Sequence, residues 1–251
     1  MKALILAAGY ATRLYPLTEN FPKPLLKVQQ VSIIDRLLSS LEEISFIDEY
    51  IVVSNHKFFQ HFVNWKNEAE QKKLYEKTIT LLDDGSIDNE HRLGAVQDIE
   101  FAIEKCSIND DLFVLAGDNV LDFSLKPFAE YQQLKKTAVI MCHEEKNVEK
   151  LKKTGVVEID DQNKVISMEE KPENPKSFWA VPPFYIYPKE ELSWIKKGIC
   201  EGCGTDAPGS FIAWYCNSRC VYAWPMPGKR YDVGDLKSYE AVQSAVLNSK
   251  K

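Results

Sequence analysis

The N-terminal half of the sequence alternates short, uninterrupted apolar runs with longer segments of helical periodicity. The apolar runs, typical of strands buried on both faces, are residues 3–8, 50–53, 78–82 and 112–116. The segments that place apolar side chains at helical spacing are residues 33–44, 57–74 and 95–103. Strand and helix in alternation favour a parallel sheet flanked by helices, with ligand sites in loops at the carboxyl ends of the strands.

The second half has a different rhythm and favours an inserted or appended β-rich part. The expected strands are residues 155–159, 165–169, 184–187 and 221–224, and the expected helices are residues 189–197, 208–215 and 235–247. Asp235 is the expected cap of the last helix. Because no repeat, low-complexity tract or long linker interrupts the chain, we expect a single domain over residues 1–251.

Charge and hydropathy exclude several classes of protein. Lys and Arg number 31 against 37 Asp and Glu, a net charge of −6. A protein that grips nucleic acid by its phosphates normally has a basic excess, so we expect no nucleic-acid partner. No stretch approaches the roughly 18 apolar residues of a membrane span, and the N-terminal apolar run is too short for a signal peptide. We expect a cytoplasmic protein without a membrane partner.

The loop that follows the first apolar run has the composition of a phosphate cradle. Small residues lead into Gly9, and the loop then offers one arginine, Arg13, and later one lysine, Lys23. Small residues let backbone amides approach phosphate oxygens, while an arginine binds them as a fork and a lysine as a point charge. The alternative interpretation is an ordinary turn with two solvated cations.

Two carboxylates stand where a hard cation can be held. Asp118 follows the buried run 112–116, and Asp232 precedes the last expected helix. Mg²⁺ is commonly bound by one or two carboxylates together with substrate phosphates. The alternative is that both are turn residues. A third segment, Glu169-Glu170-Lys171-Pro172, can offer a carboxylate to sugar hydroxyls and an ammonium to a phosphate, or it is a solvated strand end.

Taken in order, these segments resemble the sugar-phosphate nucleotidylyltransferases, most closely the glucose-1-phosphate thymidylyltransferase-like branch. The resemblance runs from Lys2 to about Val246. Its motifs are Gly-x-x-Thr-Arg-Leu-x-Pro-x-Thr with a later Lys-Pro-Leu, then Gly-Asp-Asn, then Glu-Glu-Lys-Pro with Pro-Lys-Ser, and finally Asp-x-Gly before the last helix. It implies a three-layer α/β/α Rossmann-like, mainly parallel sheet with a small β-rich sugar-binding subdomain. Within one nucleotidyltransferase domain, residues 1–140 are then the nucleotide-binding half and residues 141–251 the sugar-phosphate-binding half with the closing helix.

The implied reaction is Mg²⁺-dependent transfer of a nucleoside monophosphate from a nucleoside triphosphate to a sugar 1-phosphate, with release of pyrophosphate. The favoured substrates are dTTP or UTP and glucose 1-phosphate. By resemblance, Arg13 and Lys23 are catalytic and Asp118 and Asp232 hold Mg²⁺. The implied nucleotide-binding residues are Leu6, Ala8, Gly9, Tyr10, Ala11, Thr12, Gly94 and Asp118. The implied sugar-phosphate-binding residues are Gly155, Glu170 and Lys171.

Three positions depart from the family pattern. Ala11 stands where the loop usually has a second glycine, and an alanine costs roughly 1 kcal/mol if that position needs a positive φ. Val181-Pro182-Pro183 replaces a frequent Thr-Gly pair near the sugar. No glutamine that would read the base is evident between Asp83 and Arg92.

Other functions stay open. The same chemistry can act on a non-sugar phosphate such as phosphocholine, as in a cytidylyltransferase, with Trp179, Phe184 and Trp214 as a candidate aromatic cage. A non-catalytic nucleotide-sugar-binding regulatory protein is the second alternative, supported by the departures alone. A nucleotide-sugar-dependent glycosyltransferase would be expected to carry Asp-x-Asp after a strand, which Asp118-Asn119-Val120 does not supply. The sequence leaves the oligomeric state open, a homo-oligomer included.

Four late cysteines have spacings compatible with a zinc site. They are Cys200, Cys203, Cys216 and Cys220. The expected helix over residues 208–215 would rise about 1.5 Å per residue and hold the two pairs about 10 Å apart. Thiolates of one zinc ion all lie about 2.3 Å from the metal. The sequence therefore favours reduced, partly buried thiols over a zinc site.

Overall fold

The computed structural model describes residues 1–248, which form two compact units. Unit 1 consists of Met1–Lys2, Leu93–Leu115 and Pro127–Met226, and unit 2 consists of Ala3–Arg92, Ala116–Lys126 and the described residues from Pro227 onward. In this division the segment Leu93–Leu115 belongs with residues from later in the chain. Each unit is described separately.

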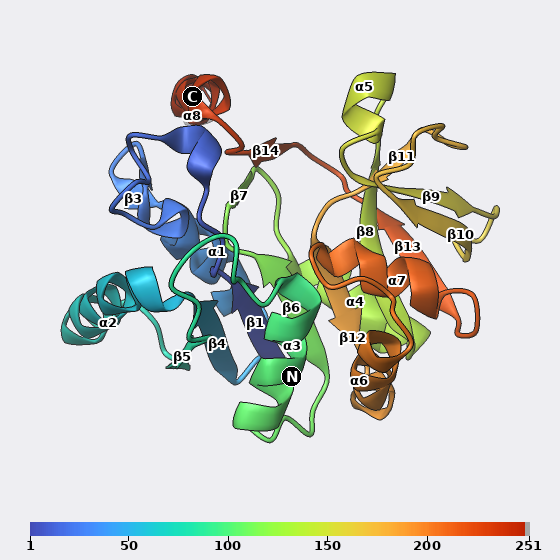
Figure 1. Ribbon diagram of the computed structural model, residues 1–251, viewed down its shortest axis with the longest axis horizontal. Helices are drawn as coiled ribbons and strands as arrows, with labels where there is room; N and C mark the ends of the chain where they lie inside the picture. Colours follow the sequence, from blue (N-terminus) through green and yellow to red (C-terminus); the bar gives the residue numbers. More distant parts are fainter. Residues whose placement is uncertain (249–251) are drawn as a thin grey trace. The chain divides into compact units, whose positions relative to one another are not determined.

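Unit 2 contains the parallel strands expected for the N-terminal half. Its strand order is β1-β4-β5, and β4 pairs with β5 in parallel, with Glu49 opposite Thr78 (Figure 1). Its strands are β1 (Lys2–Leu6), β2 (Lys27–Val28), β3 (Val31–Ser32), β4 (Glu49–Ser54), β5 (Thr78–Asp83), β7 (Asn119–Leu121) and β14 (Arg230–Asp232). Its helices are the 3-10 turns η1 (Thr12–Leu14) and η2 (Lys23–Leu25) and the α-helices α1 (Ile33–Glu42), α2 (His56–Gln71) and α8 (Leu236–Asn248).

Side chains at the helix starts explain where these helices begin. Ser32 caps α1, accepting a hydrogen bond from the Asp35 amide at 3.1 Å, and Asn55 caps α2 by accepting one from the Phe58 amide at 2.9 Å. Asp235 caps α8, as expected, by accepting a hydrogen bond from the Ser238 amide at 2.7 Å. The Ser238 hydroxyl in turn accepts the Asp235 amide.

Unit 1 contains most of the β-rich part. Its strand order is β10-β9-β11-β8-β12-β6, and β13 also pairs with β8. Its strands are β6 (Leu112–Ala116), β8 (Ala138–Glu144), β9 (Gly155–Ile159), β10 (Val165–Glu170), β11 (Trp179–Val181), β12 (Phe184–Tyr187) and β13 (Val221–Pro225). Its helices are α3 (Ala95–Lys105), α4 (Lys126–Lys135), α5 (Val148–Leu151), the 3-10 turn η3 (Lys189–Glu191), α6 (Ser193–Cys200) and α7 (Pro208–Tyr215).

The pairing in unit 1 is mixed. The β8–β13 pair is parallel, whereas β9–β10, β9–β11, β8–β11, β8–β12 and β6–β12 are antiparallel. Parallel neighbours need a crossover of a dozen or more residues. The turn between β9 and β10 is far shorter than that, so these two strands form an antiparallel hairpin, seen as adjacent arrows in Figure 1.

Most expected elements are confirmed, with one correction. The expected helix over residues 189–197 is instead a 3-10 turn, η3, followed by a separate helix, α6. Leu192 is both the C-cap of η3 and the N-cap of α6. The helical periodicity of residues 189–197 therefore spans two short elements. Strand β8 and helix α4 were not predicted from the sequence.

One apolar cluster in unit 2 underlies the strand-end loops. It consists of Leu14, Leu26, Val28, Ile33, Val120, Val233 and Val242, with Ala11 packed against it. Three members of this cluster lie within two positions of predicted site residues in the sequence: Leu14 follows Arg13, Val120 lies near Asp118, and Val233 follows Asp232. Burial of this cluster therefore holds together three chain segments that carry predicted site residues.

Among the described residues, no helix has both the length and the apolar character needed to cross a bilayer.

Candidate active site

The loop after β1 is anchored on both sides of Gly9. The Ala8 carbonyl accepts a hydrogen bond from Asn55 Nδ2 at 2.9 Å, and the buried Tyr10 donates its hydroxyl to the Ser86 carbonyl at 2.9 Å. Gly9 itself is exposed, and no atom lies within 4 Å of the position that a Cβ would take. The loop is therefore fixed in place and leaves open space at its glycine.

Ala11 adopts a left-handed conformation, with φ 48° and ψ 41°. It precedes η1, and its carbonyl accepts the Leu14 amide at 2.9 Å and the buried Thr18 hydroxyl at 2.8 Å. These two bonds hold the turn in a conformation that glycine adopts readily and alanine does not. The alanine at this position therefore carries a local strain of order 1 kcal/mol.

Arg13 lies exposed on η1. Hydrogen bonds from Ser238 lower the pKa of Asp235, and the positive charge of Arg13 adds to this effect. The guanidinium thus lies close enough to the start of α8 to influence a carboxylate there.

Lys23 joins the two predicted metal carboxylates. Its Nζ lies 2.6 Å from Asp118 Oδ2 and 3.9 Å from Asp232 Oδ1. Lys23 is only 7% exposed, within the short turn η2. Asp118 and Asp232, which are more than one hundred residues apart in the sequence, therefore share one cation in unit 2.

The β7–β14 pair brings the two carboxylates together. In this antiparallel pair, Asp232 lies opposite Asn119, the residue after Asp118. Asn119 is fully buried and donates from Nδ2 to Asp118 Oδ1 at 2.8 Å. Both carboxylate oxygens of Asp118 are thus oriented, one by Asn119 and the other by Lys23.

Arg230, which was not among the residues predicted from the sequence, joins this cluster. Its Nη1 donates to Asn119 Oδ1 at 2.6 Å and lies 3.9 Å from Asp232 Oδ2. Arg230 and Asp232 are two positions apart on β14, so they lie on the same face of the strand. That spacing was the available signal, since a strand places residues i and i+2 side by side.

The cations decide the ionisation of Asp118. Burial opposes its negative charge, but the Lys23 ammonium and its hydrogen bond outweigh burial, and Arg230 adds a further attraction. Together they hold the pKa of Asp118 below its ordinary value. Asp118 is therefore a carboxylate near neutral pH, as a metal ligand must be.

The donor set fits Mg²⁺ bound together with phosphates. Asp118 and Asp232 already share one cation, the Lys23 ammonium. Within the described part of the chain, no group of three or more His, Cys, Asp or Glu is placed to hold a metal. Two carboxylates leave most of an octahedral shell to water and substrate oxygens, which is the usual way in which Mg²⁺ is bound at phosphate sites.

The predicted sugar-phosphate residues come together in unit 1. A Cβ on Gly155 would lie 2.6 Å from Met168 Cε and 3.1 Å from Glu170 Oε2, so this glycine makes room for the Glu170 side chain. A Cβ on Gly209, in the first turn of α7, would also collide with Glu170 Oε2. Burial raises the pKa of Glu170, Lys171 opposes the shift and Asp206 adds to it.

Lys171 leaves β10 with a positive φ of 50°. Its amide donates to the Thr154 carbonyl at 3.0 Å, and its Nζ lies 3.6 Å from Asp206 Oδ2. Val181, the first residue of the second departure from the family pattern, lies opposite Gly155. Gly155 thus lies beside both Glu170 and Val181, and the Lys171 side chain extends toward Asp206.

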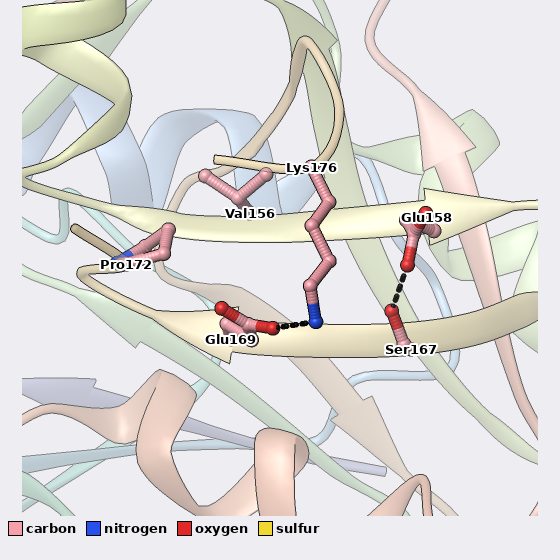
Figure 2. A pocket seen from close by; sticks show the side chains of 6 residues that line it. All are labelled: Val156, Glu158, Ser167, Glu169, Pro172 and Lys176. Carbon is pink, nitrogen blue, oxygen red and sulfur yellow. Dashed lines mark hydrogen bonds and ion pairs between the residues drawn. The ribbon is translucent and has the colours of Figure 1, made fainter. Parts of the chain in front are cut away.

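The neighbouring Glu169 lies on the opposite face of β10 from Glu170 and pairs with Lys176. Consecutive strand residues point to opposite faces, and Figure 2 shows Glu169 paired with Lys176 beside a second contact between Ser167 and Glu158. The cavity between these side chains and Val156 is about 10 Å³, room for one water. Lys176, part of the Pro-Lys-Ser motif, is therefore a structural partner of Glu169.

Gly94 belongs to unit 1, whereas the other predicted nucleotide-binding residues belong to unit 2. Its φ is 93°, and a Cβ there would lie 2.6 Å from the Thr205 carbonyl oxygen. Thr205 also accepts the Val96 amide at 3.0 Å. The positive φ of Gly94 and the close approach of the Thr205 backbone are sufficient to explain why this position is a glycine.

The late cysteines are free thiols. Cys200 ends α6 and is exposed, while Cys216 follows α7 and burial raises its pKa. Within residues 1–248, these thiols belong to no group of three or more His, Cys, Asp or Glu side chains that could hold a metal ion. The structure gives no support for a zinc site.

Unit 2 thus combines parallel strands with an open glycine loop, a buried lysine and two carboxylates, which is typical of proteins that handle phosphorylated nucleotides. The Nucleotidyl transferase family matches residues 2–249, and the chain belongs to this family.

Similar proteins support this membership. The bifunctional protein GlmU of Methanocaldococcus jannaschii is 31% identical over 197 residues, covering 78% of this chain and 42% of the relative. The glucose-1-phosphate thymidylyltransferase of Neisseria meningitidis is 30% identical over 210 residues, covering 78% of this chain and 65% of the relative. The chain spans between 38% and 65% of the lengths of the first five such relatives.

A solved structure confirms the fold. The crystal structure of a UDP-glucose pyrophosphorylase complexed with UDP-glucose has a TM-score of 0.82 at 20% identity, covering 100% of this chain and 99% of that chain. At this identity the likeness shows the α/β fold alone.

Proposed function

We propose that the protein is an Mg²⁺-dependent nucleotidylyltransferase that transfers a nucleoside monophosphate from a nucleoside triphosphate to a sugar 1-phosphate, releasing pyrophosphate. The observation that carries the proposal is the convergence of Asp118 and Asp232 on Lys23. Family membership supports the reaction class. The favoured substrates are dTTP or UTP with glucose 1-phosphate, in keeping with the thymidylyl- and uridylyltransferases among the relatives.

The nucleotide residues of unit 2 bind and neutralise the triphosphate. Backbone amides around Gly9 approach the phosphates through the open space at that residue. Arg13, exposed at the end of this loop, grips phosphate oxygens as a fork, and Lys23 supplies a point charge. Leu6, Ala8, Tyr10, Ala11 and Thr12 complete the loop, and Gly94 is retained as a nucleotide-binding candidate.

Asp118 and Asp232 are the residues that would hold Mg²⁺. When bound, the ion supplies charge neutralisation to the phosphates of the triphosphate and its leaving pyrophosphate. Asn119 and Arg230 hold Asp118 and Asp232 in place for this role.

The sugar 1-phosphate is met by residues of unit 1. Glu170 accepts hydrogen bonds from sugar hydroxyls, Lys171 binds the phosphate, and Gly155 keeps the space for the Glu170 side chain. A phosphate oxygen of the sugar 1-phosphate then attacks the α-phosphorus, and pyrophosphate leaves. No general base is needed, because a phosphate monoester is already anionic near pH 7. Both units thus serve one reaction as a single nucleotidyltransferase domain.

The phosphocholine alternative receives less support. Phe184 is fully buried in β12, and Trp214 packs against Trp194, with ring centroids 6.0 Å apart. A Cβ on Gly198 would lie 3.1 Å from Trp214 Cε3, so α6 covers that ring. Two of the three aromatic residues considered for a choline cage are therefore engaged within unit 1.

The test is pyrophosphate release with Mg²⁺, crossing dTTP, UTP, CTP, GTP and ATP against sugar 1-phosphates and phosphocholine. The proposal expects one strong pair with a sugar 1-phosphate and loss of the signal in Arg13→Ala. A signal with CTP and phosphocholine would establish the alternative substrate. Binding of a nucleotide sugar by calorimetry without turnover of any pair would establish the regulatory protein instead.

A further inference from the structure

Without ligands, the charges around Asp118 already balance. The cluster consists of two carboxylates, Asp118 and Asp232, and two cations, Lys23 and Arg230. A divalent cation added to this cluster would leave an excess of two positive charges in a partly buried place. Such an excess is unfavourable wherever the surroundings screen charge poorly.

The Lys23 ammonium pairs with Asp118 as a bound metal ion would. Its 2.6 Å bond to Asp118 Oδ2 is in the range of a short charge-assisted hydrogen bond, and it stands 3.9 Å from Asp232. Since Asn119 occupies Asp118 Oδ1, neither oxygen of Asp118 lacks a partner. A metal ion that binds Asp118 Oδ2 therefore shares that oxygen with the Lys23 ammonium and meets its like charge at close range.

Of these two partners, Lys23 is the one that can move. Asn119 is fully buried and held by Arg230 at 2.6 Å and by its place in β7. Lys23 has a flexible stem and a point charge without directional demand. Phosphates of a bound triphosphate are the natural new partners for its ammonium.

We propose that Lys23 acts as an internal counter-ion that keeps divalent cations off Asp118 and Asp232 until a triphosphate arrives and takes over its ammonium. The metal then enters with the nucleotide rather than before it. This inference rests on the proposed function, because it assumes that the two aspartates are the metal ligands.

Direct metal binding tests the proposal without any turnover. Mn²⁺, a paramagnetic substitute for Mg²⁺, is titrated into the wild type, Lys23→Met, Lys23→Gln and the control Lys27→Met, and free Mn²⁺ is followed by electron paramagnetic resonance. Lys27 is the matched control because its side chain is exposed in the same segment. Lys23→Gln retains a hydrogen-bond donor toward Asp118, so it still tests the proposal if Lys23→Met fails to fold.

Removal of the Lys23 charge should lower the Kd for Mn²⁺ by roughly tenfold or more in both variants, while Lys27→Met matches the wild type. Mn²⁺ should also raise the melting temperature of Lys23→Gln more than that of the wild type. Equal Mn²⁺ affinity in wild type and both Lys23 variants, whether tight or weak, would overturn the proposal. Failure of the proposed function itself would be distinguishable, because it appears as a wild type that releases no pyrophosphate.

Discussion

Thr18 Oγ1 donates a 2.8 Å hydrogen bond to the carbonyl oxygen of Ala11, a residue held at φ 48°. Thr18 is fully buried, so the bond is protected from water. The bond fixes the backbone at the point where the loop after Gly9 turns into η1 and presents Arg13. Ala11 therefore adopts a conformation that is usual for glycine, because the hydrogen bond from Thr18 holds its backbone there.

Ala11→Gly should therefore stabilise the protein. Relief of the left-handed strain outweighs the greater flexibility of glycine in the unfolded chain, and the net gain should be about 0.5–1 kcal/mol. Denaturant unfolding measures the change. Ala7→Gly, at a buried alanine without positive φ, is the matched control and should destabilise. A loss of stability in Ala11→Gly would show that the turn does not carry this strain.

Gly9→Ala should leave the fold intact and weaken nucleotide binding. No atom lies within 4 Å of the new Cβ, so the methyl group meets only the space that we assign to the triphosphate. We expect an unchanged melting temperature and a KM for the nucleotide raised several-fold. Gly155→Ala is the contrasting case, since its Cβ would meet Met168 Cε at 2.6 Å and should lower the melting temperature. An unaltered KM in Gly9→Ala would place the phosphates elsewhere.

Arg230→Gln should slow the reaction without large loss of fold. It removes the donor to Asn119 and the charge near Asp232, so both carboxylates lose their orientation. The expected loss in kcat/KM is about tenfold or more, measured by pyrophosphate release. Arg219→Gln breaks an exposed ion pair with Glu191 in unit 1 and is the matched arginine control. Equal rates in the two variants would show that Arg230 has no role in the reaction.

The pH dependence should reflect Glu170. Burial raises its pKa, so on acidification the folded protein protonates this carboxyl above the ordinary glutamate range. The carboxylate accepts hydrogen bonds from sugar hydroxyls, and the protonated form loses acceptor capacity. Thus kcat/KM for the sugar 1-phosphate should fall as pH decreases through a value above the ordinary pKa of a glutamate. Glu170→Gln should lower kcat/KM and abolish this acidic limb; a limb that persists would belong to another group.

The elements with strong periodicity could be predicted from the sequence. The strand Gly155–Ile159, the strand Phe184–Tyr187 and the helix Pro208–Tyr215 have the expected bounds. Strand β8 was missed although Ala138–Cys142 is a continuous buried apolar run, the same signal that identified β6. Short elements such as β7 and β14 carry too few residues for any period to emerge.

The candidate site was predictable only in part. Motif order singled out Lys23, Asp118 and Asp232, but their mutual distances depend on a pairing of β7 with β14 across more than one hundred residues. Arg230 was missed although it stands two positions before Asp232, because its hydrogen bond to the buried Asn119 depends on the long-range pairing of β14 with β7. The left-handed turn at Ala11 likewise depends on the Thr18 bond, a tertiary constraint.

The most direct test of the central claim follows the α-phosphorus. The protein is incubated with Mg²⁺, glucose 1-phosphate and UTP or dTTP carrying ³²P at either the α or the γ position, and the products are separated. The account predicts that the α label appears in a nucleotide sugar and the γ label in pyrophosphate, with both lost in Asp118→Asn. Appearance of the γ label in inorganic phosphate, or an α label that never leaves the nucleotide pool, would contradict it.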